Sequence, residues 1–304
     1  MKQERKLSPD RIPALAKALS EHFGGTMFDL MPLDVQCSRP VFHATASGRA
    51  PMFVKIASPV ETSRTLRLLG AAGSCRLFPK ALLPEAFDFD GRSVVCLEWR
   101  LGRRLEVEDM TDGEADSFLA GVCDMSAALR AAPDVQPATG EDTPDGQFAT
   151  VADYARRHPL VARFLRGLTD IPAVERSYEG RRLLPIHGDF HACNFCFENG
   201  QMTSVFDFDA MIMGLPCEDA AYPFTESIRR HGLSAAKRKR LRHTFRRLVR
   251  MSPWPLEEWR IAVNHARLRI AANRIRKHPK SFMMAFDVFR RDRLVRPLLE
   301  DLVF

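Results

Sequence analysis

The chain has 304 residues, of which 45% are hydrophobic and 27% charged, an ordinary globular composition that excludes wholesale disorder and fibrous architectures. No apolar run approaches the ~20 residues that a membrane-spanning helix needs, and the opening letters MKQERKLSPDRIP contain no apolar stretch, so no secretory signal is expected. The net charge is +7, and seven cysteines, an odd number spread along the chain, argue against a disulfide framework and predict a cytoplasmic protein.

The first third of the chain predicts a small sheet with two helices. One helix is expected over 8–23, and a second begins with the capping-box pattern Ser58-Pro59-Val60-Glu61. Short strand-like runs bounded by turn residues are expected at 27–36, 40–46, 51–57, 85–89 and 93–99. The order strand, strand, strand, helix, strand, strand predicts an N-terminal lobe over residues 1–99.

The remainder, residues 100–304, predicts a larger helical lobe. Residues 133–147 are rich in Pro, Gly and acids and predict a surface loop, whereas 183–209 is expected to form strands. Apolar residues recur at helical spacing in six stretches, at 112–131, 148–168, 218–230, 234–250, 256–276 and 281–302. Together the two parts predict an α+β fold of two lobes, a small antiparallel-sheet lobe and a larger helical lobe.

One short segment, HGDFHACNFCFENGQMTSVFDFD, carries residues suited to phosphoryl transfer. That reaction needs a group that orients a hydroxyl and takes its proton, and oxygen ligands for the Mg²⁺ that neutralises the phosphates. Asp189 fits the first role, and Asn194 and Asp207 fit the second. The intervening Asn199-Gly200 predicts a two-residue hairpin turn. Pairing of its strands would bring Asn194 and Asp207 to the same end of the hairpin, where both can reach one metal ion.

The pattern HGDFHACN followed by FDFD resembles the signature of the aminoglycoside phosphotransferase and choline kinase family, which has a bilobal, protein-kinase-like fold. The resemblance implies a kinase that uses ATP and Mg²⁺. It implies that Asp189 is the catalytic base and that Asn194 and Asp207 are the metal ligands. His187 is included in the catalytic site as the residue that packs and orients the loop. The later run GLPCED is similar to the family's G-x-P-x-x-D motif, so its Asp219 would brace the catalytic loop.

The same resemblance assigns a nucleotide site to the N-terminal lobe. Lys55, in the run FVKI, resembles the lysine that contacts the phosphates, and backbone groups of Glu98 and Arg100 are expected to bind the adenine edge. Ser38 is assigned to the phosphate-covering turn, although this turn contains no glycine. Glu61 is the only acid in the helix after Lys55 and is therefore the candidate partner of that lysine. Its capping-box position equally allows a purely structural role.

Two further groups leave alternatives open. Asp209 is either a second metal ligand or a structural residue, and the structural role is favoured. His187, His191, Cys193 and Cys196 offer zinc-ligand types, but no second CxxC or HxxxH pattern accompanies them, so zinc is disfavoured.

The uneven distribution of charge bears on the acceptor. Residues 226–304 contain 21 basic and 7 acidic residues, whereas 1–225 contain 24 and 31. Because a cationic acceptor needs carboxylates or aromatic faces, we expect a neutral or anionic small-molecule hydroxyl acceptor: a sugar, a sugar phosphate, a glycan or a lipid head group. An aminoglycoside or choline-type kinase with a cationic acceptor is one alternative. A pseudokinase adaptor that binds polyanions through its basic helices is another.

The helix expected at 234–250 combines an apolar stripe, Leu241, Phe245 and Leu248, with many basic residues. Such a helix either lies on an anionic membrane surface or packs its stripe on its own domain, and we favour the second arrangement. No specific nucleic-acid partner is expected.

Overall fold

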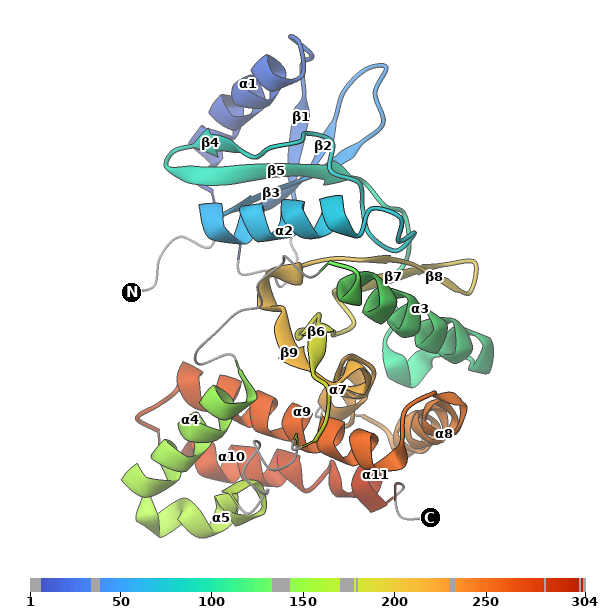
Figure 1. Ribbon diagram of the computed structural model, residues 1–304. Coiled ribbons are helices and arrows are strands. Elements are labelled where there is room, and N and C mark those ends of the chain that lie inside the picture. Colours follow the sequence, from blue (N-terminus) through green and yellow to red (C-terminus); the bar gives the residue numbers. More distant parts are fainter. Residues whose placement is uncertain are drawn as a thin grey trace.

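The computed structural model describes residues 7–33, 39–132, 143–169, 178, 180–229, 233–281, 283–300 and 302. The sheet and two helices form one lobe, and the remaining helices form a larger lobe beneath it (Figure 1). This arrangement confirms the predicted α+β fold with a small antiparallel-sheet lobe and a larger helical lobe.

The sheet of the first lobe is antiparallel and has the order β1-β2-β3-β5-β4. Its strands are β1 (Asp29–Pro32), β2 (Val41–Thr45), β3 (Met52–Ala57), β4 (Phe87–Phe89) and β5 (Arg92–Glu98). Successive side chains of a strand point to opposite faces. Val54 and Ile56 of β3 are therefore buried in one core with α1 (Ile12–His22), while Lys55 points to the opposite face and reaches the second lobe.

Helix α2 (Pro59–Ala71) covers the face of the sheet that lies towards the second lobe (Figure 1). It begins where the sequence predicts. The Ser58 hydroxyl accepts the Glu61 N–H at 3.3 Å, and the Glu61 carboxylate accepts the Ser58 N–H at 2.9 Å. Leu68 and Leu69 near its other end pack into the larger core, which continues into the second lobe. The helix thus joins the two lobes through apolar contacts.

The second lobe is built from helices around two small strand pairs. The pairs are β6 (Leu184–Ile186) with β9 (Ile212–Gly214) and β7 (Phe195–Glu198) with β8 (Gln201–Val205). The helices are α3 (Asp112–Arg130), α4 (Pro144–Arg157), α5 (Pro159–Thr169), α7 (Pro216–Ile228), α8 (Ala235–Met251), α9 (Leu256–Lys277), α10 (Met283–Asp292) and α11 (Arg296–Glu300). Short 3-10 turns lie at Pro9–Arg11, Val107–Asp109 and Phe208–Ala210.

Three expected boundaries are wrong. The single helix expected over 148–168 is two helices, because α4 ends before His158 and α5 begins after it. The loop prediction for 133–147 fails at its end, because Thr143 caps α4 and Pro144 occupies its first turn, so helix begins before residue 148. The rest of that stretch, 133–142, lies outside the described residues. The single helix expected over 281–302 is divided into α10 and α11 by a turn at 293–295.

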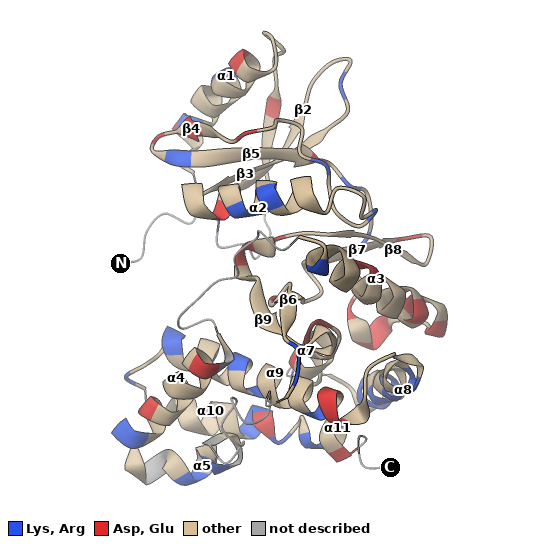
Figure 2. Cartoon of the chain, in the orientation of Figure 1, with Lys and Arg blue, Asp and Glu red and all other residues tan. Residues whose placement is uncertain are grey.

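Helix α8 packs its apolar stripe on its own domain, as favoured from the sequence. Leu241, Phe245 and Leu248 are completely buried. Its basic residues are numerous, and acids lie on the neighbouring α3 (Figure 2). The Arg247 guanidinium donates to Asp116 at 2.7 and 2.8 Å. Among the described helices, none has both the length and the apolar character needed to cross a bilayer.

Candidate active site

The loop after β6 is held in place by His187, which is completely buried. Its Nε2 lies 2.7 Å from the Phe206 carbonyl, and its Nδ1 lies 3.2 Å from the Asp189 N–H. Because one partner is an acceptor and the other a donor, the ring is neutral, with the proton on Nε2. Burial lowers the pKa of His187 to about 4, in agreement with this assignment. His187 therefore positions the loop and does not face the reacting groups.

Asp219 braces the same loop, as the resemblance implies. One carboxylate oxygen accepts the His187 N–H at 2.8 Å, and the other accepts the Gly188 N–H at 2.9 Å. Gly188 has φ +76°, and a Cβ there would lie 2.3 Å from the Ala210 carbonyl oxygen. Only glycine fits this close approach. The HGD pattern thus combines a positioning histidine, an obligatory glycine and the candidate base.

The neutral state of His187 predicts a pH-dependent stability. An unfolded histidine has a pKa of about 6.5, so the unfolded chain binds this proton at a higher pH than the folded chain. The contribution of neutral His187 to the free energy of unfolding is complete above about pH 6.5. It is lost as the pH falls towards 4, and this loss costs a few kcal/mol. His187→Gln, which keeps a donor and an acceptor but does not titrate, should lose this part of the pH dependence. Urea unfolding of both proteins between pH 7 and 4.5 measures it, and parallel stability curves would contradict it.

The predicted catalytic and metal-binding residues come together around one cavity. Asp189, Asn194 and Asp207 all line a cavity of about 370 Å³ between the lobes, and Lys55 lines it as well. The Asn194 amide donates to the Asp189 carbonyl at 2.8 Å, and the Phe206 N–H donates to the Asn194 carbonyl at 2.8 Å. These bonds join the two ends of the β7–β8 hairpin to the catalytic loop, so the convergence predicted from the hairpin is present.

Lys55 is 6% exposed, and its ammonium contacts two carboxylates of the second lobe. It donates to Asp207 at 2.7 Å and to Asp209 at 2.6 Å. Burial alone would lower the pKa of Lys55, but the two carboxylates raise it above its ordinary value, so the side chain is charged. Burial likewise opposes ionisation of Asp207, yet Lys55 lowers the pKa of that carboxyl. Asp207 has left-handed backbone angles (φ 63°), a strained conformation that is concentrated at functional sites.

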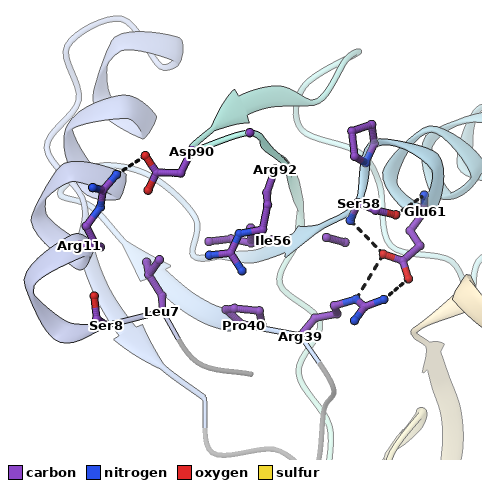
Figure 3. A pocket seen from close by; sticks show the side chains of 13 residues that line it. Leu7, Ser8, Arg11, Arg39, Pro40, Ile56, Ser58, Glu61, Asp90 and Arg92 are labelled. Atoms are coloured by element: carbon purple, nitrogen blue, oxygen red, sulfur yellow. Dashed lines mark hydrogen bonds and ion pairs between the residues drawn. The ribbon is translucent and has the colours of Figure 1, made fainter. Parts of the chain in front are cut away.

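Glu61 does not take the role expected of it. Its carboxylate is occupied by the Ser58 N–H and by the guanidinium of Arg39, whose Nε donates at 3.2 Å (Figure 3). Lys55 is instead oriented by Asp207 and Asp209. The Lys55–Glu61 pair is therefore a wrong prediction, and the capping alternative is correct. Arg39 and Glu61 also line a second cavity, of about 770 Å³, together with Arg11, Asp90 and Arg92. Figure 3 shows these side chains. The cavity is separate from the one lined by Lys55, Asp189, Asn194 and Asp207.

The donor set fits Mg²⁺. Asn194 and Asp207 offer an amide and a carboxylate oxygen, which are the ligands this ion prefers. In addition, Oδ1 of Asp209 is buried and has no hydrogen-bond partner within the described part of the chain. A buried carboxylate oxygen without a donor is costly, and a cation beside Asp207 would satisfy it. Asp209, for which a structural role was favoured, is thus part of the charged centre.

The adenine-edge assignment stays a prediction for Arg100, whereas the Glu98 N–H does not fit it. Arg100 lines the cavity together with Leu97 and Trp99. The Glu98 N–H donates to the Lys80 carbonyl at 2.8 Å, so it is not free to bind a base, and the Glu98 carboxylate contacts Arg100 at 3.0 Å. Ser38 lies outside the described residues.

Two cationic groups that sequence reasoning missed lie beside the candidate base. Arg269 of α9 approaches the Asp189 carboxylate at 3.4 Å, and His191 Nε2 lies 3.6 Å from it. Burial opposes ionisation of Asp189, but the bond from His191 and the charge of Arg269 lower its pKa to about 2. Burial also disfavours the charged form of His191, yet Asp189 raises its pKa to about 10. Asp189 is therefore ionised at neutral pH, as a base must be.

A family model described as "Phosphotransferase enzyme family" matches residues 29–254, a stretch that contains every predicted site residue. The chain belongs to this family. It is therefore a phosphotransferase, and the family resemblance read from its HGD and FDFD motifs is confirmed. A search of curated proteins finds no match.

Solved structures of similar fold include other phosphotransferases. A ternary complex of a thermostable mutant of aminoglycoside phosphotransferase APH(4)-Ia with ADP and hygromycin B is 18% identical, with a TM-score of 0.62 over 93% of this chain and 98% of that one. Amicoumacin kinase hAmiN, in complex with AMP-PNP, Ca²⁺ and Ami, is 12% identical, with a TM-score of 0.62 over 97% and 96%. A putative aminoglycoside phosphotransferase from Ralstonia eutropha JMP134 is 17% identical, with a TM-score of 0.62 over 95% and 97%. These likenesses confirm the protein-kinase-like fold.

Proposed function

We propose that this phosphotransferase moves the γ-phosphoryl group of ATP, with Mg²⁺, to a hydroxyl of a neutral or anionic small molecule. The observation that supports this proposal most strongly is the meeting of Lys55, Asp189, Asn194 and Asp207 around one cavity between the lobes. Two structural relatives were solved with ADP or AMP-PNP, and one of them also with Ca²⁺. These ligands agree with nucleotide and divalent-metal use by the same fold.

In the proposed reaction Asp189 accepts the proton of the acceptor hydroxyl while that oxygen bonds to the γ-phosphorus. The bond from the γ-phosphorus to its bridging oxygen breaks, and ADP leaves. Lys55 pairs with phosphate oxygens, and Asn194 and Asp207 would hold Mg²⁺, which when bound neutralises charge on the phosphates. His187 and Asp219 keep Asp189 in place through the loop backbone.

Two alternatives are less well supported. A pseudokinase adaptor would tolerate the loss of a site residue, whereas Lys55, Asp189, Asn194 and Asp207 are all present. A cationic acceptor would meet the Arg269 guanidinium beside the base, and like charges repel. The cytoplasmic location and the lobe boundary after residue 99 stay predictions.

A screen of hydroxyl compounds tests this function. Neutral sugars, sugar phosphates and aminoglycosides are incubated with ATP and Mg²⁺, and ADP release and product mass are measured. We expect a phosphorylated product from a neutral or anionic compound, and none in EDTA or with Lys55→Met. Preferred turnover of the aminoglycosides would contradict the acceptor class, and ADP release that Lys55→Met leaves unchanged would contradict the site.

A further inference from the structure

One buried arginine, at the end of α7, has no hydrogen-bond partner among the residues that the structure describes. Arg229, at the C-terminal end of α7, is 2% exposed. None of its three guanidinium nitrogens has a hydrogen-bond partner among the described residues. Burial lowers its pKa to about 10, so the side chain is still charged at neutral pH. A buried charge without hydrogen bonds is unfavourable unless an ion of opposite sign accompanies it.

The neighbouring acids do not fill this role, because other arginines bind them. Both oxygens of Asp292 accept from Arg267 at 2.8 Å. Asp287 is shared by Arg274, at 2.7 Å, and Arg291, at 3.0 Å. After burial, the largest influence on the pKa of Arg229 is the charge of Asp292, which raises it, whereas the charges of Arg274 and Arg291 lower it. Asp292 thus acts on Arg229 through its charge while its oxygens are hydrogen-bonded to Arg267, so an anion from outside the chain could supply the missing hydrogen bonds of Arg229.

The same face of α7 connects Arg229 to the catalytic loop. Tyr222 and Arg229 are seven residues apart, which places them on one helix face about 10 Å apart along the axis. The guanidinium of Arg269 lies 4.9 Å from the centre of the Tyr222 ring and also contacts Asp189. Helix α7 packs against α9, which carries both Arg269 and Arg274 (Figure 1). We name Arg229, Arg269 and Arg274 the arginine cluster.

We propose that the arginine cluster binds a phosphate group of the acceptor, so that the substrate is a phosphorylated sugar or polyol whose free hydroxyl lies at Asp189. This inference rests on the proposed kinase function. A guanidinium presents a planar fork of donors that matches phosphate oxygens. Arg274, with 32% of its side chain exposed, extends the cluster from buried Arg229 towards solvent. Glu226, on the same helix face, engages in an interaction of its own.

Thermal unfolding in inorganic phosphate tests the anion site without the need for turnover. Sodium phosphate is compared with sodium chloride at equal ionic strength for the wild type, Arg229→Met and the control Arg247→Met, whose arginine lies on α8 and pairs with Asp116. We expect phosphate to raise the melting temperature of the wild type and the control by about 2–4 °C. Arg229→Met should show no such shift. An equal shift in all three proteins, or no shift in any, would overturn the proposal. Arg229→Met is expected to fold, because replacing an unpaired buried charge by an apolar side chain is often neutral or stabilising.

Matched acceptor pairs then test the substrate class. ADP release and product mass are measured for glycerol and glycerol 3-phosphate, ribose and ribose 5-phosphate, and glucose and glucose 6-phosphate. In at least one pair, we expect kcat/KM for the phosphorylated member to be at least about tenfold higher, a difference of about 1.4 kcal/mol. In Arg229→Met this preference should disappear, because the KM for the phosphorylated member rises. Equal use of both members would overturn the inference but not the kinase function. A third result is also informative. If no compound is phosphorylated, but phosphate raises the melting temperature only of proteins that retain Arg229, the result counts against the kinase function and not against the anion site.

Discussion

Asp189→Asn is expected to lose about 10²- to 10⁴-fold in turnover while it still binds ATP. A positioned general base contributes about this much, and an amide of nearly the same shape cannot take up the acceptor proton. The contacts that place the loop use the main chain of residue 189. Its carbonyl accepts from Asn194, and its N–H donates to His187. The substitution therefore removes the base and leaves the loop and the metal-binding residues in position.

The measurement separates chemistry from binding. Steady-state kcat is compared with the affinity for ATP and Mg²⁺ from calorimetric titration, for the wild type and the variant. Asp153→Asn is the matched control, because Asp153 is a half-exposed carboxylate of α4 that pairs with Arg156 and Arg157. Full turnover in Asp189→Asn would show that another group takes the proton, and loss of ATP binding would show that Asp189 belongs to the nucleotide site.

The catalytic segment was predictable because its geometry is local. Asn199 and Gly200 have positive φ values, as a two-residue hairpin turn requires, and the register pairs Phe195 with Val205. The turn fixes the register beside it, which pairs Glu198 with Gln201, and a β-bulge between Cys196 and Phe197 then shifts the pairing by one residue. The sequence therefore predicts that Asn194 and Asp207 share one end of the hairpin, but it does not predict the bulge that sets their exact register.

The charge pairing between the lobes was not predictable in the same way. The sequence offers Lys55 three candidate carboxylates, Glu61, Asp207 and Asp209, and which of them pairs with the lysine depends on how closely the lobes approach. Glu61 is satisfied within its own lobe by Ser58 and Arg39, which leaves the lysine to the second lobe. The second acid of the FDFD motif was the available signal, because two carboxylates so close together require a cation.

The sequence contains even less information on contacts between a distant helix and the catalytic loop, or on isolated β-bridges. Arg269 reaches Asp189 across 80 residues of sequence, and no pattern in α9 distinguishes it from the other arginines of that helix. The Glu98 N–H donates to the Lys80 carbonyl. This bond lies next to an isolated β-bridge between Ala81 and Leu97, which no strand pattern in the sequence indicates. In both cases the missing information is tertiary packing, which sequence periodicity does not carry.

Asp207→Asn is expected to weaken ATP binding in the presence of Mg²⁺ by about 10- to 100-fold, because a charged ligand interaction of about 1.5–3 kcal/mol is lost. Asparagine tolerates left-handed backbone angles, so the φ of 63° at this position can persist. Lys55 also retains Asp209 at 2.6 Å, which keeps the ammonium in the cleft. The variant should thus fold normally and bind ATP in EDTA about as well as the wild type does.

Asp209→Asn provides the matched control, since it removes the neighbouring carboxylate and leaves Lys55 paired with Asp207 at 2.7 Å. ATP affinity is measured for all three proteins with Mg²⁺ and with EDTA, and the ratio of the two affinities isolates the metal contribution. If Asp207 holds the ion, this ratio falls in Asp207→Asn and changes little in Asp209→Asn. The reverse result would assign the ion to Asp209 and leave Asp207 as the anchor of Lys55. Equal losses in both variants would indicate that the two carboxylates bind the ion together. The buried Oδ1 of Asp209, which has no hydrogen-bond partner among the described residues, also allows this result.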